Sequence, residues 1–262
     1  MMRHEGRRRV EASGNSAEDP QVPSLVEAIP RLNVEDGAEL RVAHTETHSW
    51  SIDVTGTIWA RKRVVVTGIE GLLAEAVSWL LARRLRVPVP DAAVTLSGDL
   101  SWLSKQITPV VHWDAIHQGG ITNLMDLGKV LVLDVLVNNP DRHAGNLLLQ
   151  PDPDESAIKL WAIDAGNALI GWPSDYAAAR DDLPSLRNLA RGLPVSEVRE
   201  SALEAAEVAC TISSLEIVDM VVHACHLANE PQGELITTTL VSRCARAREL
   251  TDEYLMRIGA TR

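Results

Sequence analysis

Three oxygen-bearing side chains near the middle of the chain have the types that phosphoryl transfer requires. Asp141 and Asn146 lie five residues apart in a loop with Gly145, and Asp164 follows further along. Phosphoryl transfer needs little covalent chemistry from the protein, which must position the reactants and neutralise charge. One carboxylate can face an acceptor hydroxyl, while amide and carboxylate oxygens suit Mg²⁺, a cation that prefers hard ligands and few protein contacts. These residues therefore indicate one base and one metal site.

The segment between Asn146 and Asp164 has the pattern of a β-hairpin. Leu147–Leu149 and Ile158–Ile163 are short apolar stretches, and a turn-like stretch, 151–155, separates them. Because a hairpin brings its two ends together, Asn146 and Asp164 are expected to converge on one ion. The alternative is purely structural: a polar helix-to-strand turn in which the first acid is a cap and Asp164 begins another turn.

Two strings around this hairpin carry a family resemblance. Residues 138–149 read Asn-Asn-Pro-Asp-Arg-His-Ala-Gly-Asn-Leu-Leu-Leu, and residues 163–166 read Ile-Asp-Ala-Gly. They resemble the catalytic loop and metal-binding turn of the HipA-like and phosphatidylinositol-kinase-like atypical kinases. That branch has Asp-Arg-His where ordinary protein kinases have His-Arg-Asp. Asp134, a helical acid one turn before Asn138, also fits the branch.

The resemblance implies a role for each polar residue of the loop. Asp141 would be the catalytic base, and Asn146 and Asp164 would be the Mg²⁺ ligands. His143, counted with the catalytic residues, would either organise the loop or contact phosphate. ATP and Mg²⁺ are the implied cofactors.

A kinase also needs a strand lysine and a helix glutamate. Ala60 and Lys62 share one face of an expected strand, and Ala two residues before Lys resembles the lysine strand of kinases. Glu75 lies on an expected helix that continues, as in the family, to a Leu-x-x-Pro-x-Pro string at 85–90. The resemblance implies that Lys62 holds the α- and β-phosphates and that Glu75 orients it. The alternatives are a surface lysine between Arg61 and Arg63 and a solvated glutamate.

The nucleotide-covering parts match the family less well. No Gly-rich loop lies between the first expected strands, where residues 45–49 stand instead. The backbone N–H groups and hydroxyls of this stretch, including Thr47 and Ser49, could cradle phosphate, or the stretch could be an ordinary polar turn. Trp102 and Ser104 fall where the crossing between two lobes is expected, so that backbone contact with adenine is one interpretation and simple packing of Trp102 the other.

Apolar periodicity places these residues on strands first and helices later. Alternation predicts strands within 39–66 and at 92–96, and helical spacing predicts an amphipathic helix over 71–85. A buried helix is expected at 122–137, and about four helices from residue 184 onward. The fold class is α+β. The resemblance implies a bilobal protein-kinase-like fold, with a disordered arm at 1–22, a small strand-rich N-lobe at 23–100 and a larger helical C-lobe at 101–262.

Composition narrows the classes of partner. The 262 residues carry a net charge of −11, and no basic stripe suggests a nucleic-acid binder. Three cysteines do not make a disulfide framework. No uninterrupted apolar run reaches the length of a membrane span, and the N-terminus lacks the apolar centre of a signal peptide. A cytoplasmic protein without a membrane partner is expected.

These observations favour an ATP- and Mg²⁺-dependent phosphotransferase with a hydroxyl acceptor. A protein Ser/Thr or a small molecule ranks above a lipid, because no basic or amphipathic membrane patch is evident. Family analogy adds a possible regulatory protein partner. One alternative keeps the fold but transfers AMP. Another is an ATP-binding pseudokinase, which the presence of Asp141, Asn146 and Asp164 disfavours.

Overall fold

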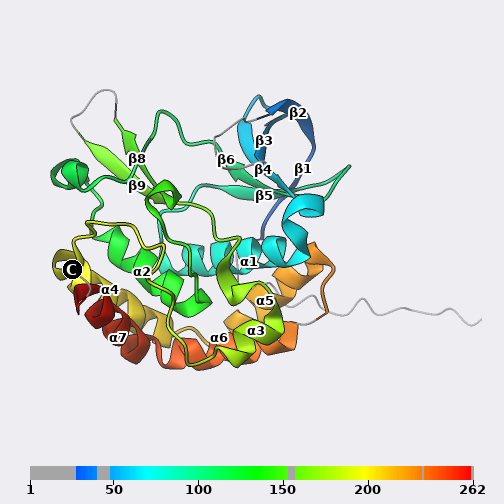
Figure 1. Cartoon of the computed structure of the whole chain (residues 1–262). Helices are drawn as coiled ribbons and strands as arrows, with labels where there is room; N and C mark the ends of the chain where they lie inside the picture. Colours follow the sequence, from blue (N-terminus) through cyan, green and yellow to red (C-terminus); the bar gives the residue numbers. More distant parts are fainter. Residues whose placement is uncertain (1–27, 40–47, 153–156, 232, 261–262) are drawn as a thin grey trace, which may run out of the picture.

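The chain combines two β-sheets with a large set of helices (Figure 1). The computed structural model describes residues 28–39, 48–152, 157–231 and 233–260. Strands predominate in the first part of the chain and helices in the second, which confirms the predicted α+β class. The sheets lie on one side of the molecule in Figure 1, and the C-terminal helices lie on the other.

The larger sheet has six strands in the order β1-β5-β6-β4-β3-β2. Only β1 and β5 pair in parallel, and the remaining neighbours are antiparallel. Its strands are β1 (Arg31–Leu32), β2 (Val34–Glu39), β3 (His48–Asp53), β4 (Ile58–Arg63), β5 (Ala92–Thr95) and β6 (Ser101–Lys105). β6 begins directly after the predicted lobe boundary at residue 100, yet it lies in the interior of this sheet.

Helix α1 (Val64–Leu85) starts earlier than the sequence predicted. The β-branched run Val64–Val66 favours a strand by propensity, but the strand β4 ends at Arg63 and the helix begins at once. Gly68 has φ 78°, and the helix bends at this residue after its first turn. Glycine adopts this conformation without strain because it has no Cβ. From Gly71 onward, α1 is buried along most of its length, so it forms a central element of the core.

Among the described helices, α1 alone is long and apolar enough to cross a membrane, unless α4 and α5 form one span bent by 90°. The most apolar window of α1 is 61% buried inside the protein. A core helix meets the same criteria of length and hydropathy. The packing of α1 against α2 and α5 accounts for its apolar sequence.

The second sheet follows the larger one along the chain and has the order β7-β8-β9. Strands β8 (Leu147–Pro151) and β9 (Ile158–Ala162) form the predicted hairpin, and β7 (Val111–His112) pairs with β8. The buried helix α2 (Asp126–Val137) precedes the hairpin, as predicted, but starts four residues later. Its C-cap, Asn138, adopts the left-handed conformation that ends the helix.

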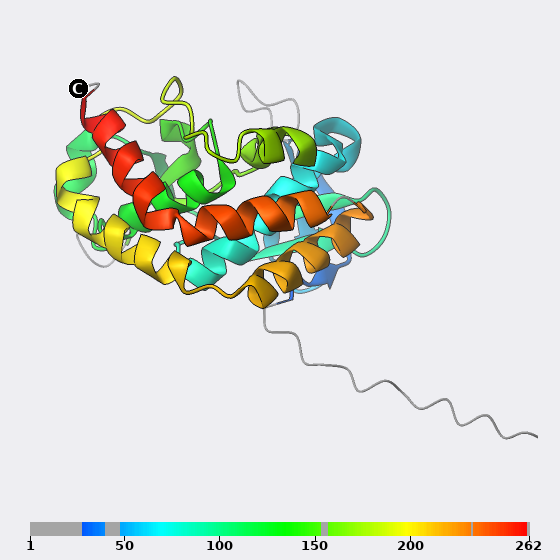
Figure 2. The same cartoon turned by 90° about the horizontal axis from the view of Figure 1, so that it is seen from below.

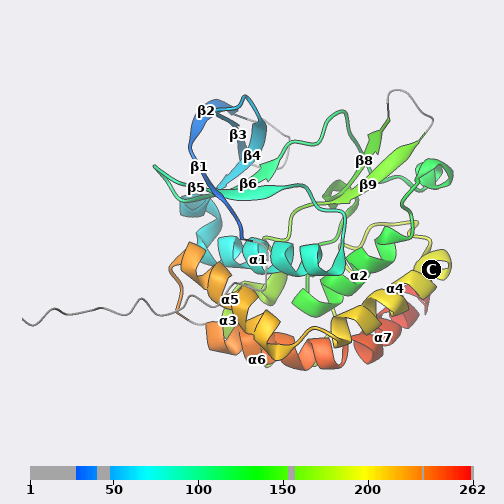
Figure 3. The ribbon, with the colours of Figure 1, turned by 180° about the vertical axis from the view of Figure 1, so that it is seen from behind.

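The long C-terminal helices cover the underside of the molecule (Figure 2). Figure 3 shows α1 and α2 between this layer and the two sheets. The long helices are α4 (Val195–Cys210), α5 (Ser214–Ala228), α6 (Gly233–Ala245) and α7 (Ala247–Ala260). The short ones are η1 (Ala115–Gly120), η2 (Ala144–Asn146), η3 (Ala168–Ile170) and α3 (Pro173–Ala178). The four long helices confirm the predicted helical C-terminal part.

A buried arginine on α6 fixes the end of α2. Arg243 is fully buried and donates to the backbone oxygens of Val135, Ala179 and Arg180. Tyr176 on α3 donates its hydroxyl to the Leu136 oxygen at 2.6 Å. A cation is favoured at a helix C-terminus, where carbonyl groups lack intrahelical partners. These contacts fix the C-terminal end of α2, which directly precedes the polar loop at 138–146.

A histidine on α5 ties down the start of the described chain. His223 Nε2 accepts a hydrogen bond from the Ile29 backbone N–H at 3.0 Å, which requires the neutral imidazole. Burial lowers the pKa of His223 below its ordinary value; Asp219 opposes this, whereas His226 and Arg31 reinforce it. The bond contributes stability above about pH 6.5, the unfolded pKa, and this is lost as pH falls through the lower folded-state pKa.

Acidification is therefore expected to weaken the wild-type protein more than a His223→Gln variant. Between about pH 7.5 and pH 5, the free energy of unfolding of the wild type should fall by more than that of the variant. Urea unfolding at both pH values measures this difference. Equal pH dependence in the two proteins would remove His223 as the titrating group.

Candidate functional site

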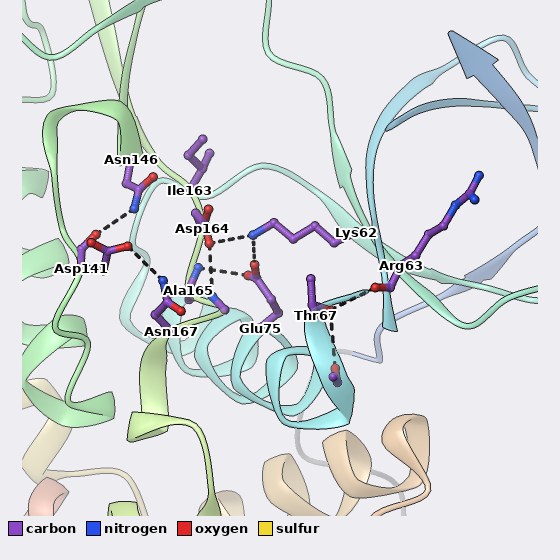
Figure 4. Close-up of polar contacts among 12 residues, drawn as sticks. Lys62, Arg63, Thr67, Glu75, Asp141, Asn146, Ile163, Asp164, Ala165 and Asn167 are labelled. Carbon is purple, nitrogen blue, oxygen red and sulfur yellow. Dashed lines mark hydrogen bonds and ion pairs between the residues drawn. The ribbon is translucent and has the colours of Figure 1, made fainter. Parts of the chain in front are cut away.

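A lysine with two carboxylates lies between the larger sheet and the hairpin (Figure 4). Lys62 on β4 forms an ion pair with Glu75 of α1, and its Nζ lies 2.7 Å from Asp164 Oδ1. The Lys62 side chain is 12% exposed, so water screens this cluster weakly. Burial alone would lower the pKa of Lys62, but Glu75 and Asp164 outweigh burial and raise the pKa above its ordinary value. The ammonium group therefore stays charged.

Strand alternation separates Lys62 from its arginine neighbours. Arg61 and Arg63 both form ion pairs with Asp36 of β2, the second at 3.4 Å. In Figure 4 the Arg63 side chain points away from Glu75 and Asp164, toward which Lys62 extends. Successive side chains of a strand face opposite sides, so only Lys62 of the three reaches the cluster.

The turn after β9 positions Asp164 and links it to α1. Asp164 has φ 58°, an uncommon left-handed conformation for a residue other than glycine. Its Oδ1 accepts from the Gly166 N–H at 3.3 Å, and Glu75 Oε2 accepts from the Ala165 N–H at 3.2 Å. Glu75 thus orients both Lys62 and the turn that bears Asp164.

Asp141 is held at the other side of the site by two amide side chains. Asn188 donates to its Oδ1 and Asn167 to its Oδ2, each at 2.9 Å. The Asn146 amide nitrogen donates to the Asp141 backbone oxygen at 2.8 Å. The Asn146 Oδ1 accepts no hydrogen bond from any residue in the described part of the chain, which leaves it available as a ligand.

A buried ion pair anchors the loop that carries Asp141 and Asn146. The Arg142 guanidinium lies 2.9 Å from Asp134 Oδ1 and 3.0 Å from Oδ2, and both side chains are almost fully buried. Arg142 also donates to the backbone oxygens of Asn146 at 3.1 Å and Ile163 at 2.6 Å. Burial lowers the pKa of Arg142, but Asp134 more than offsets it and raises the pKa. Arg142 therefore joins the loop to both ends of the hairpin.

His143 acts locally in the loop. Its side chain is exposed, and Nδ1 accepts a hydrogen bond from the Gly145 N–H at 3.0 Å, which caps η2. This contact suits the predicted role as a loop organiser. A phosphate contact through the other ring nitrogen remains the second prediction.

The residues predicted for the nucleotide-covering parts lie elsewhere than expected, or outside the described chain. Trp102 and Ser104 are inside β6, where they pair with Lys62 and Ala60. The crossing does not lie at these residues, because their backbone is hydrogen-bonded to the neighbouring strands β4 and β5. Contact of Trp102 and Ser104 with ATP stays a prediction. Their side chains line a cavity of about 30 Å³ together with Glu75 and Asp164.

The structure describes only part of the predicted phosphate-covering stretch. Ser49 lies on β3 opposite Arg61. Its hydroxyl is buried and finds no hydrogen-bond partner among the described residues. Thr47 falls outside the described residues. Phosphate contact by Thr47 and Ser49 stays a prediction.

Some residues of the site were not expected from the sequence. Asn167 directly follows the Asp-Ala-Gly string, and this short motif could have indicated its position beside Asp141. Asn188 and Asp141 are 47 residues apart, and no motif connects them. The Asp-Arg-His string singles out Arg142 but does not reveal that its ion-pair partner is Asp134 on α2.

The oxygen atoms of this site fit Mg²⁺ better than they fit a softer metal. Asn146 and Asp164 offer hard oxygen donors, and the described residues include no cluster of three His, Cys, Asp or Glu side chains able to hold a metal. Mg²⁺ commonly takes one or two protein carboxylates and completes its shell with phosphate and water oxygens. The pair can thus hold a phosphate-bound Mg²⁺, with its remaining ligands from nucleotide and solvent.

Comparison with known proteins identifies a fold relative. The Helicobacter pylori proinflammatory kinase CtkA superposes with a TM-score of 0.60, at 13% sequence identity, over 88% of this chain and 99% of that chain. No family model and no curated protein sequence matches the chain. A likeness at this identity shows the fold alone. The chain therefore has an atypical-kinase-like α+β fold.

Proposed function

We propose that this protein is an ATP- and Mg²⁺-dependent phosphotransferase that transfers phosphate to a hydroxyl acceptor. The observation that carries the proposal is the Lys62–Glu75–Asp164 cluster, set beside the loop with Asp141 and Asn146. The acceptor hydroxyl belongs to a protein Ser/Thr or a small molecule. The HipA-like and phosphatidylinositol-kinase-like assignment, a cytoplasmic location and a regulatory protein partner rest on the sequence resemblance.

The proposal places the nucleotide between two lobes. Of the described residues, those from 28 to 105 form the strand-rich lobe, because β6 belongs to its sheet, and those from 106 onward form the helical lobe. Lys62 then contacts the phosphates, and Asn146 and Asp164 hold Mg²⁺ against them. When bound, Mg²⁺ neutralises charge on the phosphate oxygens.

Each side chain has one task in this mechanism. Lys62 exchanges its contact with Asp164 for a phosphate oxygen when nucleotide binds, while Glu75 keeps Lys62 oriented. Asp141 orients the acceptor hydroxyl and takes its proton as the oxygen attacks the γ-phosphorus, and ADP leaves. Asn167 and Asn188 donate to the Asp141 carboxylate and so hold it for this proton transfer.

Asp164→Asn is expected to weaken binding of Mg²⁺ with a non-hydrolysable ATP analogue by about 10- to 100-fold. The substitution removes the carboxylate charge from the metal site but keeps a side chain of similar shape. Isothermal titration calorimetry with and without Mg²⁺ measures the effect. Asp175→Asn, at an exposed acid on α3, is the matched control.

The reaction itself is tested by mass spectrometry of acceptors after incubation with ATP and Mg²⁺. Gain of a phosphate by a protein or metabolite in the pool supports the proposal, and gain of AMP replaces it with nucleotidyl transfer. Absence of any turnover, together with unchanged ATP binding by Asp164→Ala, contradicts it.

A further inference from the structure

A cavity of about 490 Å³ opens beside the proposed base. It is bounded by the stretch before η1, by the loop at 138–146 and by the segment 187–192. The lining residues used below are Trp113, Asp114, His143, Arg187, Asn188 and Arg191. Because Asn188 donates to Asp141 Oδ1 at 2.9 Å, this cavity adjoins the carboxylate that would face the acceptor.

Two arginines of this cavity carry uncompensated positive charge. Arg187 and Arg191 are exposed, and neither guanidinium group forms a hydrogen bond or ion pair with any residue in the described ranges. Some surface arginines of this acidic protein, such as Arg199 and Arg248, are paired with carboxylates. Arg187 and Arg191 instead place two unpaired positive charges beside one acid-poor cavity.

The other titratable groups in the cavity wall are one acid and one histidine. Asp114 Oδ1 accepts from the Ile116 N–H at 3.1 Å and caps η1, so part of its charge is already engaged. His143 uses Nδ1 to accept from Gly145, which leaves Nε2 as the nitrogen able to donate. The polar groups that can face a ligand here are therefore mainly donors.

The segment 187–192, which carries both arginines, is fixed to the stretch before η1 and to the loop at 138–146. Trp113 Nε1 donates to the Arg191 backbone oxygen at 3.0 Å, and the Ala190 N–H donates to the Arg142 oxygen at 2.9 Å. Gly192 has φ 69°, and a Cβ there would lie 2.7 Å from the Ala115 Cβ, so the chain approaches η1 closely. These contacts fix the backbone that carries the two arginines relative to Asp141.

We propose that Arg187 and Arg191 bind an anionic group, a carboxylate or a phosphate, that the acceptor carries near its hydroxyl. The inference rests on the proposed function and names the class of acceptor for the same site. A guanidinium group matches carboxylate and phosphate oxygens with paired N–H donors and retains its charge throughout the physiological range. An acidic or phosphorylated peptide and a phosphorylated small molecule both supply this chemistry.

The test compares anionic and neutral probes of both sources. Serine peptides flanked by Glu or phosphoserine are compared with Gln-flanked peptides, and fructose 6-phosphate with fructose. Binding without nucleotide is measured by calorimetry, and transfer by label from ATP. We expect one anionic series to bind at least about 10-fold more tightly than its neutral match, and the series that does so identifies the source.

Arginine substitutions complete the design. Arg187→Gln and Arg191→Gln should each weaken binding of the anionic probe about 10-fold and raise its KM with little change in kcat, while Arg187→Lys should recover part of the loss. Arg257→Gln, at an exposed arginine on α7, is the control and should bind as the wild type does.

Two outcomes separate this inference from the proposed function. Phosphate transfer with equal KM for anionic and neutral acceptors, unchanged in both glutamine variants, overturns the anion site and leaves the phosphotransferase. Arginine-dependent binding of an anionic probe without transfer to any acceptor supports the anion site and counts against the phosphotransferase.

Discussion

Asp141→Asn is expected to lower the rate of phosphate transfer by about 1,000-fold, within the range for loss of a general base. The amide keeps the size of the carboxylate but cannot take a proton from the acceptor. It still offers one oxygen to Asn167 or Asn188, and the other amide can rotate to accept instead. The fold and the affinity for Mg²⁺ with ATP should therefore change little.

Single-turnover transfer from labelled ATP, with nucleotide affinity measured in parallel, checks this expectation. Asp175→Asn serves again as the control for loss of one surface acid. Transfer by Asp141→Asn at the wild-type rate would assign the base to another group. Equal loss of transfer and of nucleotide affinity would mean that Asp141 supports binding.

Arg142→Met is expected to reduce the free energy of unfolding by about 3–5 kcal/mol, the range for breaking a buried ion pair by removing one partner. Asp134 is fully buried and, among the described residues, would keep only the Asn139 side-chain donor at 2.8 Å. The backbone oxygens of Asn146 and Ile163 would lose a charged donor as well. The melting temperature should fall by roughly 10 °C.

Calorimetry and urea unfolding measure this loss, with Arg199→Met as the matched control. Arg199 pairs with Asp252 at the surface, where an ion pair contributes at most about 1 kcal/mol. Combining Arg142→Met with Asp134→Leu should recover part of the stability, because no buried charge is then left unpaired. A loss below about 0.5 kcal/mol in Arg142→Met would show that the pair does not anchor the loop.

The parts of the site that could be predicted from the sequence are those that a short segment determines. Asp141 and Asn146 share one loop, and the hairpin places Asp164 at its far end by local geometry. Period-two alternation put Lys62 on its own face of β4, and the structure brings it to Glu75 and Asp164. Their roles in nucleotide binding remain predictions that the experiments above address.

Contacts between distant segments could not be predicted in this way. Asn188 meets Asp141 only because the segment 187–192 is tied to Trp113 and Arg142. The sequence predicts Trp102 in the crossing between the lobes, because a single sequence does not show that the strand containing Trp102 pairs with β4 and β5. Val64–Val66 favours a strand by its β-branched residues, yet tertiary context makes it the first turn of α1.

The most direct test of the central claim is a crystal structure of the protein with a non-hydrolysable ATP analogue and Mg²⁺. We predict that the metal binds Asn146 Oδ1 and the Asp164 carboxylate, with Lys62 on the phosphates and Glu75 still paired with it. Asp141 should face the γ-phosphate side of the nucleotide. A metal bound elsewhere, or a nucleotide that does not contact Lys62, would contradict the assignment.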